Sequence, residues 1–116
     1  MVDKWIQEIK EKANPELLGM ILVHNGVVRA TSKDGKVVRM MKLSFNRDKL
    51  QFHINQFKAK EGILDIKVWI NEGILKVGDD IMYTLVAGRF RADVLPTLQE
   101  LLSVIKNDIV REEEVY

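Results

Sequence analysis

The chain contains no cysteine, which excludes disulfide bonds, thiolate metal ligands and a cysteine nucleophile. Any reaction that moves sulfur would therefore need a partner to bring the sulfur. Only two histidines are present, His24 in an apolar run and His53 beside the apolar stripe of a helix. Neither is accompanied by a cluster of ligand residues, so both are interpreted as structural, and the sequence predicts no metal site and no bound cofactor.

An excess of charge of one sign and long apolar runs are also missing. The 18 Lys and Arg residues against 17 Asp and Glu residues leave a formal net charge of +1. No long-range basic field therefore steers the protein onto nucleic acid, and any anion that it binds is expected to be small. The apolar runs are far shorter than a membrane span, and residues 1–5 carry charges where a signal peptide needs an apolar core. We expect a soluble, cytoplasmic protein that binds neither nucleic acid nor membrane.

The 116 residues suffice for one domain, so we expect a single domain over residues 1–116. Apolar residues at intervals of three and four predict three helices, over about 3–13, 46–61 and 93–106. Asp3 and Asp93 are the expected caps of the first and last helices, and Pro96 is then tolerated because it falls in the first turn. Gly62 is expected to end the middle helix in a left-handed conformation.

Runs rich in β-branched and apolar residues predict strands over about 20–29, 37–43, 64–70 and 80–87. Asp34-Gly35 predicts a hairpin turn between the first two strands, and residues 71–79, with their glycines, predict a long irregular hairpin between the other two. The tail over 109–116 is expected to add a short strand or to fray. The order α-ββ-α-ββ-α predicts an α+β fold with an antiparallel sheet.

Four cations lie where a predicted strand or helix ends: Arg29, Arg89, Lys106 and Arg111. Together they predict a site for a small anion such as a phosphate. Simpler explanations stay open, since Arg29 could be an ordinary solvated arginine, Arg89 a partner in surface ion pairs, and Lys106 a cation stabilised by the helix dipole. A lysine with a depressed pKa could in addition transfer protons. The acidic run 112–114 is interpreted as a solvated tail.

Several short segments, taken in order, carry a resemblance to a known family. They are Gly19 with Gly26-Val27-Val28-Arg29, Gly73-Ile74-Leu75-Lys76-Val77-Gly78-Asp79, Val86-Ala87-Gly88-Arg89, and Lys106 with Ile109-Val110-Arg111-Glu112. Over about residues 14–112 the chain resembles the large, catalytic subunit of molybdopterin synthase. The resemblance implies an α/β-hammerhead fold and a homodimer within a heterotetramer. It also implies a partner, a small ubiquitin-like sulfur-carrier subunit with a Gly-Gly C-terminus.

The resemblance further implies a reaction. Sulfur would pass from the thiocarboxylated small subunit to a pterin phosphate, cyclic pyranopterin monophosphate (precursor Z), forming molybdopterin in molybdenum cofactor biosynthesis. By position in the family pattern, Lys106 would be the catalytic residue that exchanges protons. Arg29, Arg89 and Arg111 would bind the substrate and neutralise its phosphate.

The chain departs from the family pattern at three positions. Gly88 and Ile70 stand where the family has histidines, and Arg111 stands where it has a lysine. The arginine keeps the charge but loses a group that can release a proton. The departures keep a second hypothesis open, a non-catalytic binding or scaffold relative that docks a ubiquitin-like partner.

Overall fold

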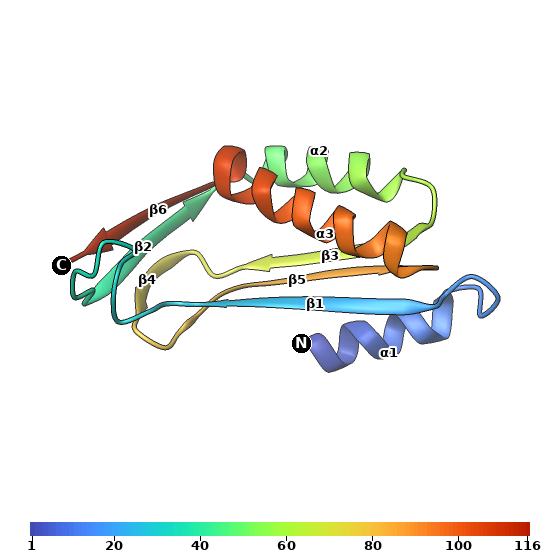
Figure 1. The fold of residues 1–116 in the computed structure, drawn as a ribbon, viewed down its shortest axis with the longest axis horizontal. Helices are drawn as coiled ribbons and strands as arrows, with labels where there is room; N and C mark the ends of the chain where they lie inside the picture. The colour runs from blue at the N-terminus through green and yellow to red at the C-terminus, as the bar shows by residue number, and fades with distance from the viewer.

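Two three-stranded antiparallel sheets and three helices make up the fold of the computed structural model, which describes all 116 residues. The elements in chain order are α1 (Val2–Lys12), β1 (Met20–Val27), β2 (Met40–Phe45), α2 (Arg47–Lys58), β3 (Ile63–Ile70), β4 (Gly73–Lys76), β5 (Asp80–Gly88), α3 (Arg91–Val104), a π-helical turn η1 (Ile105–Ile109) and β6 (Val110–Val115). Figure 1 shows the two sheets following one another along the long axis of a molecule that measures 49 × 25 × 23 Å. The predicted α+β class and the antiparallel pairing are confirmed.

The larger sheet has the strand order β1-β5-β3, and β5 pairs antiparallel with both neighbours. Figure 1 shows α2 and α3 on one face of this sheet and α1 on the other. Side chains of successive strand residues point to opposite faces. Val86 therefore joins the main core with Leu101 and Ile105, whereas Leu85 packs under α1 against Ile9. Burial on both faces explains why β5 is almost continuously apolar.

The predicted hairpin between the first two strands is wrong. β1 pairs only with β5, and β2 pairs with β4 and β6 in the smaller sheet, whose order is β4-β2-β6. A turn does form at Asp34-Gly35, where Gly35 has φ +80°, but it is closed by a single bridge between Thr31 and Val37. Strand character was visible in the sequence, but the choice of partner depends on contacts between residues far apart in the chain.

Two strands belong to segments that the sequence left irregular. β4 lies within the connection between β3 and β5, which otherwise pair as the predicted long hairpin. The tail forms β6 and pairs with β2 from Val110, opposite Phe45, to Val115, opposite Met40. The C-terminal segment is therefore part of the smaller sheet, at the left end of Figure 1.

The ends of the helices confirm some expectations and correct others. Asn46 caps α2, because its side-chain oxygen accepts a hydrogen bond of 3.0 Å from the Lys49 amide. Phe90, not Asp93, is the N-cap of α3, so Pro96 lies in the second turn and leaves the carbonyl of Ala92 without its helical donor.

α1 begins at Val2, so Asp3 lies in its first turn and is not the cap. Gly62 has the expected left-handed conformation, with φ +84°, but α2 has already ended at Lys58. None of the helices combines the length and the apolar character needed to cross a membrane.

Candidate active site

Lys106 lies on η1, the π-helical turn that links α3 to β6. The neighbouring Ile105 is fully buried and Ile109 is 4% exposed, so the turn is anchored in the core while the lysine points outward. The carboxylate of Asp108 lies 2.9 Å from His53 Nε2 and 3.2 Å from Lys49 Nζ. These two side chains of α2 hold the turn against that helix. A π-helical insertion of this kind often occurs at a functional site, because it turns one side chain away from the regular helix face.

A cavity of about 230 Å³ opens beside Lys106, between the end of α3 and the strands β1 and β5. His24 and Gly26 reach it from β1, since both belong to the face of the sheet that α3 covers. Glu112 contributes a carboxylate from β6. The remaining lining residues are Ile81, Met82 and Leu102. His24, which the sequence placed inside an apolar strand, thus lies at the same cavity as the predicted catalytic lysine.

A second cavity, of about 190 Å³, adjoins the first through Glu112, which lines both. Arg29 lies here, and its guanidinium donates a hydrogen bond of 3.3 Å to Thr31 Oγ1. The other lining residues are Val27, Ser32, Lys33, Met41 and Glu114. The fold therefore brings two of the four predicted site residues, Lys106 and Arg29, to neighbouring cavities.

Lys33 is a further cation at this place, and the sequence analysis did not single it out. Hydrogen bonding with the Lys106 side chain, and then charge repulsion from it, lowers the pKa of Lys33. The available signal was the polar loop that follows Arg29, but the loop length alone does not say which element the loop will meet.

Glu112 and Glu114 lie on β6 and are not part of a solvated tail. The period of two along a strand points them toward the cavities and points Arg111 and Glu113 to the other face of the smaller sheet. This alternation could be assigned only once the tail was known to form a strand. No group of three or more His, Asp or Glu side chains is arranged to hold a metal ion.

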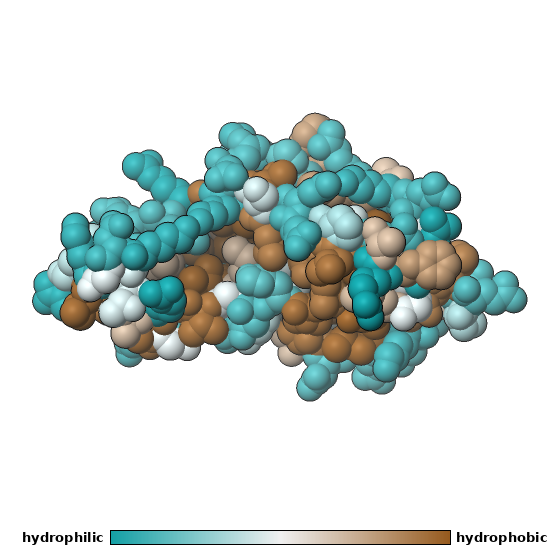
Figure 2. All heavy atoms as spheres, viewed as in Figure 1, coloured by the Kyte–Doolittle hydropathy of each residue, from teal (hydrophilic) through white to brown (hydrophobic).

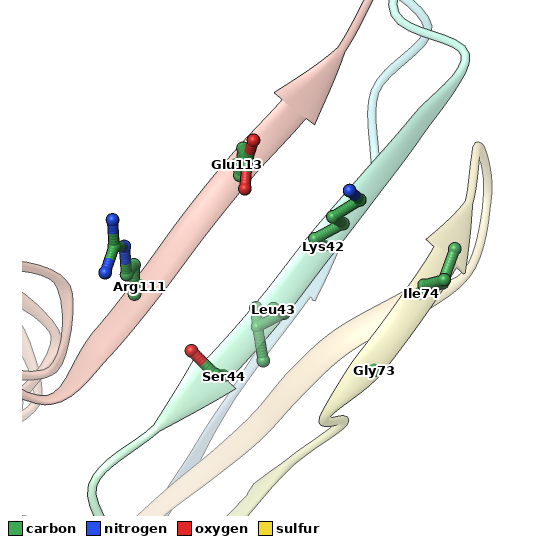
Figure 3. A pocket seen from close by; sticks show the side chains of 7 residues that line it. All are labelled: Lys42, Leu43, Ser44, Gly73, Ile74, Arg111 and Glu113. Carbon is green, nitrogen blue, oxygen red and sulfur yellow. The ribbon is translucent and has the colours of Figure 1, made fainter.

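Arg111 lines a different cavity, of about 250 Å³, on the outer face of the smaller sheet. Figure 3 shows its guanidinium beside β6, with Ser44 and Lys42 on β2 and Ile74 on β4. Glu113 lines the same cavity and brings a carboxylate close to the two cations. A single chain therefore does not bring Arg111 together with Lys106.

Arg89 lies at the opposite end of the larger sheet. It follows Gly88, which pairs with Met20, whereas the cavity of Lys106 begins where Gly26 pairs with Met82. Six residues of strand separate these pairs, which is roughly 20 Å at about 3.3 Å per residue.

The guanidinium of Arg89 is already paired. Its Nε donates a hydrogen bond of 3.0 Å to Asp93, and a terminal nitrogen lies 3.5 Å from Glu61. The hydrogen bond to Asp93 raises the pKa of Arg89. Within one chain, Arg89 is therefore a partner in surface ion pairs, which was the alternative left open by the sequence. The four predicted cations do not gather in one cavity of a single chain.

The order of the elements and the arrangement of the two sheets define an α+β protein with the fold of molybdopterin synthase. The X-ray structure of molybdopterin synthase from Staphylococcus aureus superposes with a TM-score of 0.78 at 19% identity, over 96% of this chain and 83% of that chain. Molybdopterin cofactor biosynthesis protein E from Burkholderia multivorans gives a TM-score of 0.73 at 18% identity, over 99% and 83%. At these identities the likeness concerns the fold.

The chain belongs to the MoaE protein family, whose family model matches residues 2–108. The family includes catalytic subunits of molybdopterin synthase, and the family predicted from the sequence is confirmed. A complex of subunits 1 and 2 of the molybdopterin-converting factor from Helicobacter pylori has a chain that matches with a TM-score of 0.71 at 16% identity, over 97% of this chain and 77% of that chain. The uncharacterized protein MJ0717 of Methanocaldococcus jannaschii is 29% identical over 109 residues, which cover 90% of this chain and 87% of that protein.

Proposed function

We propose that this chain is the catalytic subunit of a molybdopterin synthase. The reaction transfers sulfur from the thiocarboxylated C-terminal glycine of a small ubiquitin-like subunit to cyclic pyranopterin monophosphate, and the product is molybdopterin. The observation that carries the proposal is the position of Lys106. It lies on a turn anchored in the core and lines one cavity, and Arg29 lines the adjoining cavity. Membership of the MoaE family supports the same reaction.

The side chains divide the work according to their chemistry. The sulfur of the thiocarboxylate bonds to a side-chain carbon of the pterin as the carbon–oxygen bond there breaks, and the oxygen leaves with the electron pair and takes up a proton. Water then cleaves the acyl–sulfur bond, which releases the carrier with a carboxyl group and leaves the sulfur on the pterin. Lys106 exchanges protons with the reacting groups, since an amine accepts a proton when neutral and donates one when charged. Arg29 binds the phosphate, because its planar guanidinium offers paired donors to phosphate oxygens.

A homodimer is part of the proposal. Arg89 and Arg111 bind substrate only if a second copy of the chain carries them to the cavity of Lys106, because within one chain both lie elsewhere. The complex of two subunits in the Helicobacter pylori molybdopterin-converting factor supports the small subunit as partner of this chain. The cytoplasmic location also stays a prediction.

The test is a reconstituted conversion assay. The purified chain is mixed with a thiocarboxylated small subunit and cyclic pyranopterin monophosphate, and molybdopterin is quantified by mass spectrometry. Lys106→Ala is expected to lower turnover by about 10²-fold or more, while the affinity for the small subunit stays within about twofold, since surface substitutions away from an interface cost little. Lys60→Ala is the matched control, because Lys60 is paired with Glu100 of α3 and lines neither cavity.

Two outcomes would contradict the proposal. Unchanged turnover in Lys106→Ala would remove the catalytic assignment of this lysine. Binding of the small subunit without any product, in the wild-type protein, would favour the alternative of a non-catalytic relative that docks a ubiquitin-like partner. The occupation of family histidine positions by Gly88 and Ile70 would then reflect loss of the reaction.

A further inference from the structure

The two histidines of the chain have different surroundings. The ring of His53 is committed to the turn of Lys106, because its Nε2 lies 2.9 Å from Asp108 Oδ2. That contact is the only hydrogen bond or ion pair that a histidine ring makes with another residue of the chain. Both ring nitrogens of His24 are therefore available to a substrate or to water.

The strand β1 directs the ring of His24 toward the cavity of Lys106. Side chains alternate along a strand, so Leu22, His24 and Gly26 belong to one face, and Leu22 packs against the main core under α3. Thr84 lies opposite His24 in the register with β5, but its hydroxyl donates to Met82 Sδ over 3.4 Å. The half-buried imidazole is thus held among core residues without being used by them.

Gly26 shows where the Nε2 atom of His24 lies. A Cβ built on Gly26 would be 3.7 Å from His24 Nε2 and 3.5 Å from Ile81 Cβ. All three residues line the cavity of about 230 Å³ beside Lys106. The Nε2 atom therefore borders the space in front of Gly26, within that cavity.

Two ionisable side chains share the cavity with His24. Lys106 reaches it from η1 and Glu112 reaches it from β6. An imidazole, an amine and a carboxylate thus line one cavity, and its other walls are largely apolar. An imidazole takes up and releases protons near neutral pH, whereas an ammonium ion has no lone pair with which to accept one.

We propose that His24 is the proton acceptor that activates water for cleavage of the acyl–sulfur bond. The inference rests on the proposed function and adds a catalytic residue to its second step. His24 Nε2 takes a proton from the attacking water, and the negative charge of Glu112 in the same cavity favours the imidazolium ion that forms. Lys106 then serves the first step, in which the leaving oxygen takes up a proton.

The step balances with water as the co-reactant. The Nε2 lone pair forms an N–H bond with one proton of the water. The electron pair of the broken O–H bond stays on the oxygen, which bonds to the acyl carbon, and the pair of the acyl–sulfur bond leaves with the sulfur. The imidazolium ion returns its proton to that sulfur, so His24 is regenerated and the pterin carries a thiol.

The conversion assay tests this role through an intermediate. His24→Gln keeps a polar side chain that is too weakly basic to take the proton, so it is expected to lower kcat by about 10²-fold. The block follows formation of the sulfur–carbon bond, and the small subunit should therefore accumulate as a covalent adduct with the pterin. Intact-mass spectrometry detects the adduct, and hydroxylamine should cleave its acyl–sulfur bond. A merely structural role would slow turnover without this accumulation.

His24→Ala provides a second measurement, because it leaves room for imidazole added to the buffer. The added imidazole should restore part of the turnover and discharge the adduct. Val23→Ala is the matched control, since Val23 precedes His24 in β1, points to the other face of the sheet and lines neither cavity. Its kcat should stay within about twofold of the wild type. Thermal unfolding shows whether each variant is folded, and His24→Gln carries the test if His24→Ala is not.

The outcomes separate this role from the proposed function. Wild-type turnover together with a kcat of His24→Gln within about threefold of it would overturn the role of His24 and leave the proposed function standing. Slow turnover of His24→Gln without the adduct would do the same. Wild-type protein that forms no molybdopterin would contradict the proposed function and the role of His24 together.

Discussion

His53 Nε2 lies 2.9 Å from Asp108 Oδ2, so a side chain of α2 holds the turn that carries Lys106. The Lys49 amine, at 3.2 Å, approaches the other oxygen of the same carboxylate. Asp108 is thus the one acceptor through which two residues of α2 fix η1. The position of the candidate catalytic lysine depends on this contact as well as on the buried isoleucines around it.

The first prediction concerns Asp108. Hydrogen bonds from His53, and then from Lys49, lower its pKa in the folded protein. Its charged form therefore stabilises the fold above the unfolded pKa of about 3.9, and this contribution is lost as the pH falls through the lower, folded pKa. Asp108→Asn is expected to have a lower Tm than the wild type at pH 7, and the difference should shrink in acid. A Tm difference that does not change with pH would contradict the electrostatic explanation. Asp34→Asn, in an exposed turn, is the control.

The second prediction concerns Gly88, the last residue of β5. A Cβ at this position would overlap the carbonyl oxygen of Gly62 and lie 2.7 Å from Val94 Cγ2. Gly88→Ala should therefore lower the free energy of unfolding by about 1–3 kcal/mol or more, measured by urea denaturation. Gly26→Ala is the control, since its added Cβ would meet its nearest neighbour at 3.5 Å, an ordinary contact. Equal stability of the two variants would show that the backbone separates at Gly88.

The third prediction concerns Arg29. A charge-assisted hydrogen bond is worth about 1.5–3 kcal/mol, so Arg29→Ala should weaken binding of the pterin phosphate by roughly 10- to 100-fold and raise KM. Arg29→Lys should restore part of the affinity, because it keeps the charge but not the paired donors. Arg91→Ala is the control at the far end of the sheet. A KM that Arg29→Ala leaves unchanged would place the phosphate elsewhere.

The fourth prediction uses the separation of Arg89 from Lys106, which is roughly 20 Å within one chain. If a dimer joins them, each site takes Lys106 from one copy and Arg89 from the other. Inactive Lys106→Ala and Arg89→Ala chains, unfolded and refolded together, should then recover about one quarter of wild-type activity. About half of the randomly mixed dimers are heterodimers, and each of these has one complete site. No recovery, with mixed dimers present by native mass spectrometry, would exclude Arg89 from a shared site.

The fifth prediction concerns Tyr83, whose hydroxyl donates a hydrogen bond of 2.5 Å to Asp80. This bond raises the pKa of Tyr83, and together with a bond from Asn25 it lowers the pKa of Asp80. In a Tyr116→Phe background, the near-ultraviolet absorbance of tyrosinate reports Tyr83 alone. Asp80→Asn should move the titration of Tyr83 to lower pH. The raised pKa stabilises the fold below the unfolded value of about 10, and this contribution is lost as the pH rises through the folded pKa.

The stacked rings of Trp69 and Tyr83, with centroids 5.3 Å apart, illustrate what sequence patterns leave open. Both belong to strands that the sequence predicted, and the period of two assigns each side chain to a face. Their contact requires the register in which Trp69 lies opposite Tyr83 across β3 and β5. Figure 2 likewise shows apolar side chains emerging between polar ones over the middle of one face, which composition does not locate.

The sequence by itself determined the α+β class, the three helices and most strands, because local periodicity records which side of each element is buried. The order of its short motifs carried the resemblance to the family. The sequence also placed Lys106 and Arg29 at the ends of predicted elements and proposed them as site residues. Only the tertiary structure decided that β6 pairs with β2, that Glu112 lines the cavity of Lys106, and that Arg89 and Arg111 lie apart from that cavity. The physical reason is that strand pairing depends on burial and hydrogen bonds between distant segments, whereas periodicity reports only the environment of each segment.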